Sequence, residues 1–100
     1  MSTMEKFTSF HENNPHVYDI LVSLARKWVR KTHRDKVGIG MLYEIARWQV
    51  AMTTIDQDYK LCNDYRAYYA RLIMAQEPDL STIFNLRKSA ADKEMGLEES

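Results

Sequence analysis

The chain has 100 residues, of which 45% are apolar, so it can form one hydrophobic core and one domain. Its 14 Lys and Arg residues balance 14 Asp and Glu residues, which argues against a strongly basic nucleic-acid coat protein and against an acidic DNA mimic. Three glycines and two prolines are few for a sandwich or a barrel. We therefore expect a single all-α domain, folded over about residues 10–89, with a flexible acidic tail over residues 90–100.

The environment is indicated by three absences. Cys62 is the only cysteine, so no internal disulfide can form. No apolar run is long enough to cross a membrane, and the first twenty residues have no secretory signal. We expect a cytoplasmic protein without membrane contact, with Cys62 as a small apolar side chain in a helix.

The first strong helix is predicted from Asn14 to about Lys31. Asn14 is a good N-cap, and Pro15 suits the first helical position, where its missing N–H costs nothing. An apolar stripe with spacings of three and four follows: Val17, Ile20, Leu21, Leu24 and Trp28. Upstream of Phe10, only Phe7 could anchor the chain, so we expect a loose N-terminus.

A second helix is predicted from about Gly40 to Ala51, after a polar turn with room for a short extended piece at residues 36–39. It is apolar nearly all round, and only Glu44 and Arg47 form a polar edge, three residues apart. A helix of this kind belongs at the centre of a fold, so Trp48 is expected in the core.

A third helix is predicted to end near Gln76, because Pro78 follows. Its inward face is predicted to hold Leu61, Cys62, Tyr65, Tyr69, Leu72 and Ile73. Its outward face is predicted to hold Lys60, Asn63, Asp64, Ala67, Ala70 and Arg71, with Arg66 and Tyr68 at the boundaries. Asp79 can cap a short fourth helix whose inward residues are Leu80, Ile83, Phe84 and Leu86. The result is a compact four-helix domain with a core led by Trp28, Trp48 and Phe84.

Enzyme chemistry is not indicated. His11, His16 and His33 lack the spacing that would place two metal ligands on one helix face, and there is no cysteine pair. Gly38 and Gly40 are not followed by the third glycine of a phosphate loop. We expect no enzyme activity, no metal and no cofactor.

DNA binding is the leading functional hypothesis. Residues 26–36 contain six basic residues and one acidic residue. The third helix carries Asn and Arg donors between small alanines, as a helix in the major groove requires. With the preceding helix it would form a helix-turn-helix, although the connection of six or so residues is longer than usual. The predicted DNA-binding residues are Lys27, Arg30, Lys31, Arg34, Lys60, Asn63, Arg66, Tyr68 and Arg71. The alternative is an ordinary solvent-facing helix.

A second hypothesis is a protein partner. Tyrosines gather in the third helix, and Tyr, Trp, Met and Arg are enriched at protein interfaces. Tyr59 and Tyr68 are the tyrosines expected at the surface. They would contact a host protein or a second copy of the chain without any contact to DNA.

Several short strings support a bacterial or phage setting. They are NPHVY (14–18), IGMLYE (39–44), RW (47–48), DYKL (58–61), NDYR (63–66), YARLI (69–73) and EPDL (77–80). Over about residues 10–88 the chain resembles a group of short helical proteins of bacteria and their phages that has no settled activity. Some small phage proteins of this size are described as helix-turn-helix proteins, and others disable host factors. The resemblance implies a bacterial or phage cytosolic setting and carries over no catalytic residue. In that setting, the DNA-binding hypothesis corresponds to a regulatory, phage-related role.

Overall fold

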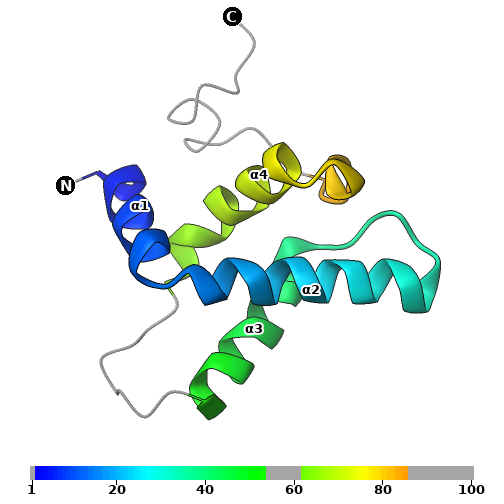
Figure 1. Cartoon of the computed structure of the whole chain (residues 1–100), viewed down its shortest axis with the longest axis horizontal. Helices are drawn as coiled ribbons and strands as arrows, with labels where there is room; N and C mark the ends of the chain where they lie inside the picture. Colours follow the sequence, from blue (N-terminus) through cyan, green and yellow to red (C-terminus); the bar gives the residue numbers. More distant parts are fainter. Residues whose placement is uncertain (1, 54–61, 86–100) are drawn as a thin grey trace, which may run out of the picture.

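The computed structural model describes residues 2–53 and 62–85 (Figure 1). This part of the chain is all-α, as predicted, and contains no strand. Its elements are α1 (Thr3–Asn13), α2 (Pro15–Thr32), α3 (Ile39–Thr53), the 3-10 turn η1 (Asn63–Tyr65), α4 (Arg66–Gln76) and the 3-10 turn η2 (Pro78–Leu80). The molecule is flat, with extents of 39 × 37 × 18 Å, so it is about two helix diameters thick.

Helix α1 was not predicted, and the expectation of a loose N-terminus is wrong. Ser2 Oγ accepts a hydrogen bond from the Glu5 N–H at 3.2 Å, and Glu5 Oε1 accepts one from the Ser2 N–H at 3.5 Å. This reciprocal capping box satisfies two backbone donors at the helix start. Phe7 is buried, with its ring stacked on that of Tyr68 and edge-on to that of Tyr69, at centroid distances of 5.3 and 4.8 Å. The aromatic contacts hold α1 against the rest of the domain.

Helix α2 begins and ends where the sequence predicts. Figure 1 shows it crossing the molecule, with α3 on one side and α4 on the other. Its buried residues are Val17, Leu21, Val22 and Ala25. Asn14 occupies the N-cap position, but its side chain does not cap the helix and instead donates to Phe10 O at 3.0 Å. The helix ends at Thr32, because the next residue, His33, has a left-handed φ of 57° that breaks the helical repeat.

Helix α3 packs against α2 and α4 through Leu42, Tyr43, Ala46 and Val50, which are buried. The prediction that Trp48 belongs to the core is wrong, because 65% of its surface is exposed. The helix has only two substantial neighbours among the described elements, so they cover one of its sides. The short extended piece predicted at residues 36–39 is not a strand, although the Val37 N–H donates to Ile83 O at 3.0 Å.

Helix α4 ends at Gln76, as predicted, and Tyr69 and Ile73 lie in the core. The predicted outward face is wrong at two positions, since Ala70 and Arg71 are buried as well. Tyr68, expected at the surface, is also buried. The physical reason is that α4 is packed by α2, α3, both 3-10 turns and the aromatic side of α1, so its fully exposed residues are confined to its ends, at Arg66, Ala75 and Gln76.

The predicted fourth helix is only the turn η2. Its expected inward residues Leu80, Ile83 and Phe84 are buried, whereas Leu86 and the acidic tail lie outside the described residues. Asp79 does not cap a helix. Its carboxylate instead accepts hydrogen bonds from Arg26 Nε and Nη2, each at 3.0 Å, and this pair ties η2 to α2.

Candidate functional site: an exposed apolar face on α3

Four large apolar side chains lie exposed along one side of α3. Met41, Ile45, Trp48 and Met52 are 43, 38, 65 and 67% exposed, and we call them the α3 face. Their spacings of four, three and four residues place them on one stripe of the helix. The stripe is about 16 Å long at 1.5 Å per residue. A contiguous apolar surface of this kind marks an interaction site more often than a single exposed side chain does.

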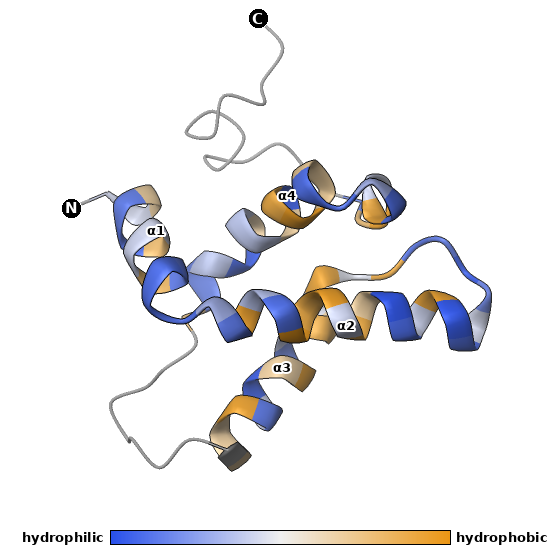
Figure 2. Cartoon of the chain, in the orientation of Figure 1, coloured by the Kyte–Doolittle hydropathy of each residue, from blue (hydrophilic) through white to orange (hydrophobic). Residues whose placement is uncertain are grey.

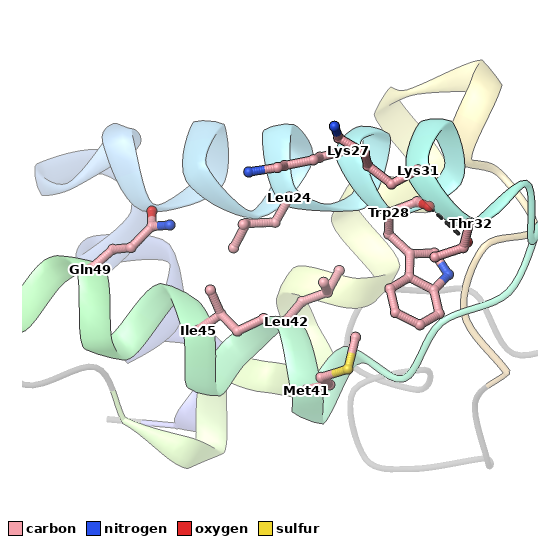
Figure 3. Close-up of a pocket in the computed structure, with 9 residues that line it drawn as sticks. All are labelled: Leu24, Lys27, Trp28, Lys31, Thr32, Met41, Leu42, Ile45 and Gln49. Carbon is pink, nitrogen blue, oxygen red and sulfur yellow. Dashed lines mark hydrogen bonds between the residues drawn. The ribbon is translucent and has the colours of Figure 1, made fainter.

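A groove borders this face on the side of α2. It has a volume of about 310 Å³, and α2 contributes Leu24 and Trp28 to it while α3 contributes Met41, Leu42 and Ile45. Figure 3 shows these side chains converging between the two helices. We call this hollow the α2–α3 groove. Because Met41 and Ile45 belong both to the groove and to the α3 face, the two form one continuous apolar surface.

The indole of Trp28 is fixed at one end of the groove. Its Nε1–H donates to Lys36 O at 2.9 Å, so the polar atom of the ring is satisfied by the backbone. Thr32 Oγ1 donates to Trp28 O at 2.7 Å (Figure 3). With its N–H used in this way, the ring presents carbon surface to the groove. Trp28 is half-buried, so the prediction that it leads the core holds only in part.

The hollow continues along α2 beyond Leu24. A second cavity of about 400 Å³ is lined by residues of α2 from His16 to Lys27 and by Gln49 of α3. The two cavities share Leu24, Lys27 and Gln49, so together they follow α2 from His16 to Thr32. The combined groove is elongated along the helix axis, which is the shape that an extended or helical segment fills.

Positive charge lies on the α2 side of the groove. Lys27 and Lys31 are exposed and line the 310 Å³ hollow, and none of the lining residues that the structure describes is acidic. Neither lysine forms a salt bridge with any residue that the structure describes. Hydrophilic residues also dominate the C-terminal end of α2 and the loop after it (Figure 2). The groove is therefore apolar at its floor and cationic along one edge.

The polar residues of α3 form hydrogen bonds and ion pairs within the domain. Glu44 and Arg47 form the predicted pair, with Nη1 and Oε1 2.8 Å apart. Arg47 Nη2 also donates to Asn63 Oδ1, and the Arg47 guanidinium lies 5.6 Å from the centre of the Tyr43 ring. The Tyr43 hydroxyl donates to Cys62 O, and burial raises the pKa of Tyr43 far above its usual value. These contacts tie the start of η1 to α3.

The residues predicted to bind DNA fall into three groups. Tyr68 and Arg71 are only 4 and 3% exposed, and Arg71 Nη1 donates to Ala67 O at 2.9 Å, so their expected place at the solvent edge of α4 is wrong. Lys60 lies outside the described residues, as does Tyr59 from the protein-partner hypothesis. The exposed members of the predicted set are Lys27, Arg30, Lys31, Arg34, Asn63 and Arg66. The structure thus gathers the basic residues at the end of α2 and does not line them up along α4.

A separate polar network joins α2 to the segment before η2. Arg26 Nη2 donates to Glu77 Oε1 at 2.7 Å, and the Tyr18 hydroxyl donates to Glu77 Oε2 at 2.8 Å. Partial burial, and then this hydrogen bond, raise the pKa of Tyr18 well above its usual value. The Arg26 guanidinium lowers the pKa of Asp79. Both shifts favour the states that the two groups already have at neutral pH, a neutral phenol and a charged carboxylate, and both states suit the hydrogen bonds of this network.

Two further searches cover the described part of the chain. No group of three or more His, Cys, Asp and Glu side chains is arranged there to hold a metal ion. None of its helices combines the length and the apolar character needed to cross a bilayer.

Comparison with protein-family models, with curated proteins and with solved structures finds no match to this chain. The function is therefore argued from the geometry of the α3 face and the groove. Sequence reasoning had assigned the members of the α3 face to the core. The missed signal was the spacing of four, three and four residues on a helix that carries more apolar residues than one buried side needs.

Proposed function

We propose that the chain is a protein-interaction module that binds its partner through the α3 face. The observation that carries the proposal is the exposure of Trp48 and Met52, each about two thirds exposed, in line with Met41 and Ile45. Covering such side chains yields about 25 cal/mol per Å² of apolar surface removed from water. Tryptophan is also among the residues that most often dominate binding energy at interfaces. This proposal is compatible with the hypothesis that the chain is a phage-related protein that binds and modulates a host protein.

The test is site-specific photo-crosslinking in cells of the source organism. A photoreactive amino acid replaces Trp48 in one variant and Ala75, exposed on α4, in the control. We expect a defined covalent adduct with one protein from position 48 and none from position 75. Adding Met52→Asp to the first variant should remove the adduct, because it places a charge in the apolar face. Equal labelling at both positions, or no adduct at position 48, contradicts the proposal.

A reduced form of the DNA hypothesis is a second candidate. It is favoured by four exposed cations at the end of α2, Lys27, Arg30, Lys31 and Arg34. With Arg71 buried, we propose contacts to phosphates by these four residues in place of base reading by α4. Four such contacts give a log–log salt dependence with a slope of about −3.6, at about 0.9 per phosphate.

Fluorescence anisotropy with random duplex DNA at about 50 and 200 mM salt tests this candidate. Arg30→Glu combined with Arg34→Glu should abolish binding, whereas Trp48→Asp should leave it unchanged. No binding at the lower salt concentration contradicts general DNA binding by the end of α2.

A further inference from the structure

We infer that the partner segment is an amphipathic helix with acidic side chains beside its apolar face, and that it lies in the α2–α3 groove. This inference rests on the proposed function and adds the chemistry of the partner. It is carried by the shape of the groove, by the unequal charge of its two edges and by the apolar α3 face that continues it.

The shape of the groove favours a helix. The two adjoining hollows follow α2 from His16 to Thr32, which is about 24 Å at 1.5 Å per residue. A partner helix of about 16 residues has the same length. Its apolar residues would meet Leu24, Trp28 and Ile45 at the floor, and its outer apolar edge would reach Trp48. The methionines suit such a contact, since their unbranched side chains adapt to the shape of a partner.

The charge of the edges favours acidic residues on one side of that helix. Lys27 and Lys31 stand one turn apart, about 6 Å along α2. Carboxylates three or four residues apart on the partner would face both amines. On the opposite edge, α3 offers apolar side chains and the neutral Gln49. Among the described residues that line the combined groove, Asp19, at the far end of the second hollow, is the acidic one.

A second copy of α3 does not have this chemistry. Residues 39–53 contain one acidic residue, Glu44, and its carboxylate is already paired with Arg47. A symmetric contact between two α3 faces would therefore leave Lys27 and Lys31 without carboxylate partners. Duplex DNA supplies anions for the two lysines, but its charged phosphates would not form favourable contacts with the apolar floor. Only a segment that combines apolar and acidic faces satisfies both parts of the groove.

The test uses three labelled peptides of about 16 residues with one common apolar face of Leu and Ile at spacings of four, three and four. Their flanking positions carry Glu, Lys or Gln. Binding to the full chain is measured by fluorescence anisotropy at about 150 mM salt, where the screening length is near 8 Å. We expect saturable binding with the order Glu, Gln, Lys from tightest to weakest.

Charge reversal on the chain supplies the decisive comparison. Lys27→Glu with Lys31→Glu should weaken binding of the acidic peptide roughly 2- to 30-fold, as two exposed ion pairs would, and should strengthen binding of the basic peptide. Arg30→Glu with Arg34→Glu changes the net charge equally outside the groove lining and should keep the original order. Trp48→Asp should weaken binding of all three peptides.

Other outcomes overturn the inference and separate it from the proposed function. Equal binding of the three peptides, lost in Trp48→Asp, would show an apolar site without a preference for acidic flanks. A dimer that Trp48→Asp dissociates, with no peptide binding, would make a second copy the occupant. Failure of every peptide with a monomeric chain would exclude this class of segment. The crosslinking experiment still decides independently whether a protein partner covers Trp48.

Discussion

Helices α3 and α4 differ in what surrounds them. Helix α4 has a buried arginine, Arg71, and a buried Ala70, whereas the more apolar α3 leaves four large side chains in solvent. The difference follows from their neighbours. Helix α4 is packed by elements on several sides, including the aromatic residues of α1, while α3 has α2 and α4 on one side. Burial is thus decided by the elements that a helix meets, and the apolar face of α3 that no described element covers is available to a partner.

The largest loss of stability is expected when Phe7, the residue that anchors α1 against α4, is removed. Phe7→Ala deletes a ring that stacks on Tyr68 and lies edge-on to Tyr69, and it should lower the free energy of unfolding by about 3–5 kcal/mol. Urea denaturation measures the change. Trp48→Ala, which removes a larger but exposed side chain, is the control and should stay within about 0.5 kcal/mol of the parent. Equal losses in the two variants would mean that the inner and outer faces were wrongly assigned.

A smaller loss of stability is expected when the buried arginine of α4 is removed. Arg71→Ala removes a buried side chain that donates to Ala67 O, so the free energy of unfolding should fall by about 1–3 kcal/mol. Arg66→Ala, at an exposed position of the same helix, should stay within about 0.5 kcal/mol. Thermal and urea unfolding distinguish the two. If Arg71→Ala leaves stability unchanged and lowers affinity for DNA, the original role predicted for Arg71 is restored.

The smallest change in stability is expected from the ion pair between Arg26 of α2 and Asp79 of η2. Arg26 lowers the pKa of Asp79, so this pair adds stability above the unfolded pKa of Asp, near 4, and loses it as the pH falls through the lower folded pKa. The stability difference between the parent and Asp79→Asn should be present at pH 7 and small, because both side chains are about half exposed. It should shrink as the pH falls below about 4 and the Asp79 carboxylate becomes protonated. A difference that stays the same size over this fall in pH would show that the ion pair is not its source.

Several parts of the fold were predictable because their signals are local. Pro15 and the apolar stripe set the start and the buried side of α2, and Pro78 set the end of α4. The capping box at Ser2 and Glu5 was also readable, although it was overlooked. The exposed side of α3 was not predictable in the same way, because a helical pattern that is apolar nearly all round does not say which side finds a neighbour. For α4, the pattern identified one buried face, but the number of elements packed around the helix is set by the tertiary fold. Trp48 was therefore predicted in the core and Arg71 at the surface, whereas the structure exposes Trp48 and buries Arg71. As a result, the candidate site lies on α3 and not on α4.

The central claim is that the α3 face is open in the free chain and covered in the complex. Acrylamide quenching of tryptophan fluorescence tests it, since Trp28 and Trp48 are the only tryptophans and the signal missing in Trp48→Phe belongs to Trp48. The account predicts strong quenching of Trp48 in the free chain and protection when the acidic amphipathic peptide is bound. A Trp48 that is already shielded in the free monomer, or that stays equally quenched with the peptide bound, would contradict it.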